Sequence, residues 1–177
     1  MTRSRTTNIL YAIAGSGVAL AFFGHGVLGA KGLDKFVALV TGNYDTMLGG
    51  TMSTATATSL VNVIGWLDIV LAVVFAGLVI AALYGKAIAY SPLAMWLFAW
   101  AALWGFLTAL SRFTATLNGK DIWDVVERGP NYLLPVALAY GIYKITTTKP
   151  TEKLPEPAVV ATNGKSETPP RELAGTH

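Results

Sequence analysis

The stretch LVNVIGWLDIVLAVVFAGLVIAALY, residues 60–84, decides the fold class of this chain. It is longer than the roughly 20 apolar residues that a helix needs to cross about 30 Å of hydrocarbon. Asp68 is its one charged residue. Its apolar residues run without the alternation that marks a strand of a membrane barrel. The stretch therefore predicts a transmembrane helix.

Three further apolar runs cover residues 8–30, 92–114 and 130–145. The last run is short, and it spans a bilayer only where the membrane thins or where the preceding segment lies in the interface. The composition is that of a membrane protein, because 53% of residues are hydrophobic, only 13% are charged and the mean hydropathy is +0.51. We therefore predict an all-α fold, a four-transmembrane-helix bundle in the lipid bilayer.

The orientation of the bundle is predicted from its basic residues. With both termini inside, one more basic residue flanks the helices on the cytoplasmic side than on the outside. The inner group is Arg3, Arg5, Lys86, Lys144, Lys149 and Lys153, and the outer group is Lys31, Lys35, Arg112, Lys120 and Arg128. The first run is too long for the apolar core of a signal peptide, so we expect it to be retained as a helix. We expect an integral protein of a bacterial inner membrane, N-in and C-in.

The connecting segments complete the predicted organisation. Residues 31–50 have apolar residues at helical spacing and predict a short interfacial helix on the outer side, as do residues 121–130. Residues 51–59 are small and polar, which predicts a flexible lead-in with Ser59 as the N-cap of the second span. We expect a membrane domain over residues 1–146 and a disordered cytoplasmic tail over residues 147–177, which are rich in Pro, Thr, Glu and Lys.

Polar residues from four helices are predicted to meet in the outer half of the bundle. These candidate ligand-binding residues are His25, Asp68, Trp104, Arg112, Glu127, Arg128 and Asn131. Ionisable groups at membrane depth are costly and usually face the bundle or a water-filled cavity. Asp68 has three interpretations: an ion pair with Arg112 that joins two helices, a ligand or proton site, or a lone protonated carboxyl. Trp104 belongs to an aromatic stripe that packs against neighbouring helices or flanks a ring-shaped ligand.

Several classes of function are excluded or disfavoured. The formal charge of +3 and the lack of a basic stripe argue against nucleic-acid binding. The absence of cysteine rules out disulfides, thiol catalysis and cysteine-held metals. His25 has only His177 as a second histidine, so bis-histidine haem ligation is impossible within the chain, and too few ligands converge for zinc. We predict no metal site and no catalytic residues, and expect His25 to lie in a helix–helix interface lined by small residues.

The sequence also resembles a known family. FFGHGVLGAKGLDKF (residues 22–36), with Gly24, Gly26, Gly29 and Lys31, is similar to the first-helix signature of DoxX-like membrane proteins. VIGWLDIVLAVVFAGL resembles their acid-bearing second helix, with Asp68 where glutamate is common, and WDVVERGPNYLLPVALA resembles the end of some members. The resemblance covers residues 8–146. It implies a four-helix bundle, and some members are linked to quinone-coupled sulfur oxidation or oxidative-stress complexes.

Three functions are consistent with these features. The first is a non-catalytic subunit or scaffold of an inner-membrane complex, with other membrane subunits or a second copy as partners. The second is a quinone-binding redox partner, in which His25 and Asp68 exchange protons with the quinone, Arg112 stabilises the anionic form and Trp104 flanks the ring. It predicts a pocket beside His25, whereas a scaffold needs few ligand-sized cavities. The third is a small-solute or proton carrier, which would need a second polar layer on the inner side.

Overall fold

The computed structural model describes residues 4–115 and 123–148, and within these residues it contains helices and no strand. The predicted all-α class is confirmed. The elements are α1 (Arg5–Ala30), α2 (Asp34–Leu48), α3 (Thr54–Leu83), the 3₁₀ turn η1 (Ala87–Tyr90), α4 (Pro92–Thr114), α5 (Trp123–Glu127) and α6 (Gly129–Thr147). Of these, α1, α3 and α4 are long and apolar enough to cross a membrane. The length and apolar composition of these helices indicate an integral membrane protein.

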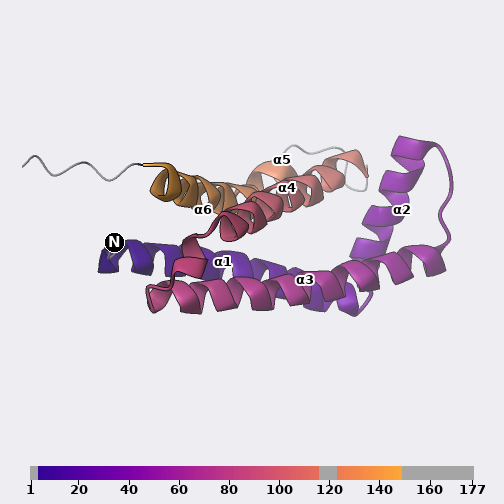
Figure 1. The fold of residues 1–177 in the computed structure, drawn as a ribbon. Coiled ribbons are helices and arrows are strands. Elements are labelled where there is room, and N and C mark those ends of the chain that lie inside the picture. Colours follow the sequence, from indigo (N-terminus) through magenta and orange to yellow (C-terminus); the bar gives the residue numbers. More distant parts are fainter. Residues whose placement is uncertain (1–3, 116–122, 149–177) are drawn as a thin grey trace, which may run out of the picture.

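The long helices form two closely packed pairs, α1 with α3 and α4 with α6, and the two helices of each pair run in opposite directions (Figure 1). In the first pair the backbones touch. A Cβ atom added to Gly65 on α3 would lie 2.1 Å from the backbone nitrogen of Ala30, and one added to Gly29 would lie 2.9 Å from the Cα of Gly65. Because dispersion contacts and not the hydrophobic effect hold helices together in lipid, this close approach stabilises the pair.

In the second pair, α4 and α6, a glycine again lets the two backbones approach closely. Aromatic side chains fill the space between the two pairs. A Cβ atom added to Gly105 on α4 would lie 2.4 Å from the carbonyl oxygen of Asn131 on α6. The rings of Phe75 on α3 and Phe98 on α4 stack with their centroids 5.1 Å apart, and both side chains are fully buried. The two pairs therefore pack into one bundle around a shared apolar core.

The second long helix begins earlier than the sequence predicts. Residues 51–59 were expected to form a flexible lead-in capped by Ser59, but α3 begins at Thr54 and its N-cap is Ser53, whose side chain accepts a hydrogen bond from the Thr56 backbone nitrogen at 3.1 Å. Ser59 instead bonds the carbonyl of Ala55 within the helix. The prediction was wrong because Ala57 is completely buried, so packing holds this first turn in place.

The predicted outer helix is present as α2, which stands across the end of the bundle (Figure 1). Val37 packs against Ala57 and Val61 of α3. On the other side the Asn43 amide donates to the Ser111 carbonyl of α4 at 2.9 Å, and the Thr114 hydroxyl donates to the Asn43 side chain. The helix is thus held between α3 and α4, and its ends are marked by glycines with positive φ angles, Gly32 and Gly49.

Parts of two sequence predictions fall outside the described residues. The second interfacial segment was expected over residues 121–130, and its described part consists of α5 and the start of α6. The predicted tail, residues 147–177, lies outside the described residues from position 149 onward. The division into a membrane domain and a tail therefore stays a prediction.

The glycine contact between α1 and α3 can be tested with two alanine variants of the same helix. Gly65→Ala places a methyl group against the α1 backbone, so we expect a loss of stability of about 1–3 kcal/mol or more. Gly77→Ala is the matched control, because nothing lies within 4 Å of its added Cβ atom. Thermal unfolding in detergent should show a lower Tm for the first variant only. Equal Tm values would contradict the close crossing.

The position of α2 can be tested by a disulfide, because the chain has no cysteine. A Cβ atom on Gly42 would lie 3.4 Å from that of Ala115, close to the separation of about 3.8 Å in disulfides. We expect Gly42→Cys/Ala115→Cys to form an intramolecular bridge under mild oxidation, measured by a mobility shift on a non-reducing gel. Lys35→Cys/Ala115→Cys should not form one, since Lys35 lies at the opposite, exposed end of α2. Equal bridging in both would refute this docking.

Candidate functional site

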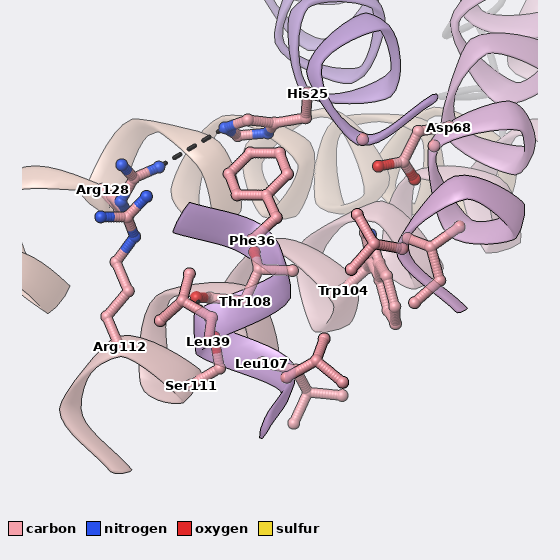
Figure 2. Close-up of a pocket in the computed structure, with 15 residues that line it drawn as sticks. His25, Phe36, Leu39, Asp68, Trp104, Leu107, Thr108, Ser111, Arg112 and Arg128 are labelled. Atoms are coloured by element: carbon pink, nitrogen blue, oxygen red, sulfur yellow. Dashed lines mark hydrogen bonds between the residues drawn. The ribbon is translucent and has the colours of Figure 1, made fainter. Parts of the chain in front are cut away.

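A partly open cavity of about 290 Å³ lies where α1, α2, α3 and α4 meet (Figure 2). Its volume is at the lower end of the roughly 300–1,000 Å³ that is usual for small-molecule sites. Most of its wall is apolar, and its polar groups are concentrated at two ends. The lining residues that carry the argument are His25, Phe36, Asp68, Trp104, Arg112 and Arg128.

Two arginines and His25 form one end of the cavity (Figure 2). A guanidinium nitrogen of Arg128, the residue just before α6, lies 3.4 Å from the Nε2 atom of His25. Arginine only donates hydrogen bonds, so Nε2 accepts in this contact and carries no proton. Arg112, in the last turn of α4, also lies close enough to His25 to act on it electrostatically. We call this group, His25, Arg112 and Arg128, the arginine end.

Asp68 and Trp104 form the opposite end (Figure 2). Asp68 is 7% exposed, and its carboxyl group faces the same end of the cavity as the Trp104 indole. Within the described residues no basic side chain forms an ion pair with Asp68. The ion pair with Arg112, one of the three interpretations of Asp68, is therefore absent there, and the aromatic side chain beside Asp68 at this end is the neutral Trp104. Because the acid and the arginines are not neutralised by each other, the cavity is polarised from end to end.

The apolar wall between the two ends comes largely from α2, and the sequence interpretation missed its contribution. Phe36, Leu39 and Val40 line the cavity from this helix, and the Phe36 ring meets the His25 ring edge-to-face with centroids 6.2 Å apart. The apolar face of residues 31–50 was visible in the sequence but was assigned to the membrane interface. That face turns inward because Val37 and Asn43 dock the helix between α3 and α4.

The seven predicted site residues divide into three groups. Those that line the cavity are His25, Asp68, Trp104, Arg112 and Arg128. Asn131 instead borders a smaller adjoining cavity of about 20 Å³, which also touches His25, Asp68 and Trp104. That space is large enough for about one water molecule. Glu127 is exposed on α5 and lines neither cavity.

The aromatic stripe of α4 faces two environments. Trp96 is largely exposed and Trp100 is half exposed on the outside of the bundle, whereas Trp104 turns toward the cavity. Trp100 and Trp104 stack with ring centroids 6.1 Å apart, which fixes the plane of the Trp104 indole. Only the last tryptophan of the stripe is therefore available to a ligand.

The donor set does not suit a metal ion. Among residues 4–115 and 123–148, no group of three or more His, Cys, Asp or Glu side chains is close enough together to hold one. The arrangement suits instead a small organic molecule that is mainly apolar and has a polar group at one or both ends.

Comparisons of the chain with protein-family models, curated proteins and solved structures found no match. The resemblance to DoxX-like proteins therefore stays a prediction. The function is argued below from the geometry of the site.

The Asp68–Trp104 contact can be tested by removing the indole N–H. Trp104→Phe removes the indole N–H at the Asp68 end of the cavity, so we expect a loss of stability of about 1.5–3 kcal/mol if this N–H donates to the carboxyl group. Trp100→Phe is the matched control, since Trp100 is half exposed and stacks on the same ring. Thermal unfolding in detergent checks the difference. Equal Tm values for the two variants would argue against a hydrogen bond that contributes to stability.

Proposed function

We propose that the chain is an integral membrane protein of four spans, with α6 as the fourth. The 19 residues of α6 extend about 28 Å, close to the hydrocarbon thickness. It runs antiparallel to α4, and their backbones meet at Gly105. An even number of spans puts both termini on one side, and Arg5, Lys86 and Lys144 support a cytoplasmic side in a bacterial inner membrane. Membership of a DoxX-like family is part of the same proposal.

We further propose that this protein binds a small lipid-soluble ligand within the bundle. The observation that carries the proposal is the cavity beside His25, with apolar walls and polar groups confined to its ends. A purely structural bundle has no need for a cavity of about 290 Å³, because lost packing contacts destabilise a helix bundle in lipid. The cavity is partly open, and we propose that its opening admits molecules dissolved in the bilayer.

A quinone is the ligand class that we propose to test first. Its flat ring suits the apolar wall, and the Trp104 indole offers a stacking surface. One carbonyl could accept hydrogen bonds at the arginine end, while the ring extends toward Asp68. The small cavity between His25 and Asp68 has room for a water through which protons could pass. This geometry favours binding, and a redox role would further require an electron donor or acceptor as partner.

The scaffold remains a second candidate, because one observation favours it. Gly24, Gly77 and Gly141 lie on different helices, and a Cβ atom at any of them would meet nothing within 4 Å. Glycines on a lipid-facing surface let another helix approach closely, which suits a further membrane subunit or a second copy. A carrier is less well supported, since Phe75 and Phe98 fill the bundle where a second polar layer would be needed.

Cavity filling tests the ligand proposal. Ile64→Trp places a large ring in the cavity wall, whereas the neighbouring Val63→Trp places it on the exposed side of α3. We expect the wild type and Val63→Trp to retain a short-chain quinone in nanodiscs, and Ile64→Trp to bind it at least about tenfold more weakly. Chromatography of the quinone retained after ultrafiltration measures this. Equal retention by both variants, or none by the wild type, would contradict the proposal.

A further inference from the structure

The arginine end brings two permanent positive charges to one wall of an apolar cavity. Arg112 comes from the end of α4 and Arg128 from the start of α6, and both act electrostatically on His25. Figure 2 shows both side chains on the His25 side of the cavity, away from Asp68. An anionic group at this wall would lie next to the guanidinium group of Arg112, and the attraction between opposite charges is stronger where little water screens it.

The described residues supply no counter-charge for Arg112. Across residues 4–115 and 123–148, no carboxylate or other acceptor contacts its guanidinium group. Asp68 lies at the other end of the cavity against Trp104, and Glu127 does not line the cavity. Arg112 therefore has donors that a ligand can use, in the forked geometry that suits a carboxylate or phosphate.

The neutral donors near the arginine end are already engaged. The Thr108 hydroxyl donates to the Gly105 carbonyl at 3.0 Å, and the Ser111 hydroxyl donates to the Thr108 carbonyl at 2.8 Å. Both side chains line the cavity, but their protons point into the α4 backbone. A ligand at this end therefore meets charged donors and not neutral ones. Charged donors favour an anionic acceptor over a neutral carbonyl.

We infer that the cavity selects a lipid-soluble organic anion, with its charged group on Arg112 at the arginine end and its apolar part along the α2 wall toward Asp68. The inference rests on the proposed ligand site and adds the charge and the orientation of the ligand. Asp68 contributes to the orientation, because its carboxyl group disfavours an anion at the opposite end. Two kinds of ligand have this chemistry. One is a ring that carries an ionised hydroxyl group, and the other is an acyl chain that carries a carboxylate or phosphate.

Two naphthoquinones of similar size but different charge test whether the charge of the ligand determines how tightly it binds. 2-Hydroxy-1,4-naphthoquinone is an anion at neutral pH, and 2-methyl-1,4-naphthoquinone is neutral. We expect the wild type in nanodiscs of zwitterionic lipid to bind the anion at least about tenfold more tightly, because charge-assisted hydrogen bonds are about twice as strong as neutral ones. Arg112→Gln should remove most of this preference, because it weakens binding of the anion much more than binding of the neutral compound. Arg112→Lys should keep part of the preference, because it keeps the charge.

Lys35→Gln is the matched control, since Lys35 is an exposed cation on α2 that does not line the cavity. It should leave the preference intact. Equal binding of the two compounds by the wild type would overturn the inference and leave the proposed ligand site standing. Binding of neither would overturn both. In nanodiscs with anionic phospholipid, competition with the hydroxy compound would identify a lipid headgroup as the anion, and no competition would indicate a free organic anion.

Discussion

No side chain separates α1 from α3 where they cross, because Gly29 and Gly65 meet backbone to backbone. The site depends on this contact. His25 lies about one turn before Gly29, and Asp68 lies about one turn after Gly65, so the crossing brings both side chains to the same cavity. A bulkier residue at the crossing would push the helices apart. It would thereby move His25 and Asp68 apart.

The cavity keeps its opposite charges apart. Buried ions in most bundles neutralise each other by pairing, and such pairs join helices without leaving a binding site. Here Asp68 lies beside the neutral Trp104 indole, and the arginines lie beside His25 at the opposite end of the cavity. Keeping these opposite charges apart costs energy, and a ligand that binds in the cavity would offset that cost. The segregation of charge is therefore the main reason to regard the group as a site and not as a structural ion pair.

The segment after the first span shows what the sequence does not determine, namely which surface an amphipathic helix packs against. The amphipathic pattern of residues 31–50 predicts a helix, and α2 is that helix. The pattern cannot say whether its apolar face meets lipid or protein, since both are apolar. Contacts of Val37 with α3 and of Asn43 with α4 turn the face inward. These contacts make Phe36 part of the cavity wall. The packing of Val37 against α3 also explains why this helix begins at Thr54, although the polar residues before Ser59 had predicted a flexible segment there.

The sequence by itself determined the helical class, the long apolar spans and the presence of His25, Asp68, Arg112 and Arg128 toward one end of them. It could do so because chain length and hydropathy measure the fit of a helix to a bilayer. Only the tertiary structure decided which of these residues face one another, because partners on separate helices depend on rotation and crossing that no local pattern records. It placed Asp68 at the end of the cavity beside Trp104 and away from Arg112, and left Glu127 outside the cavity.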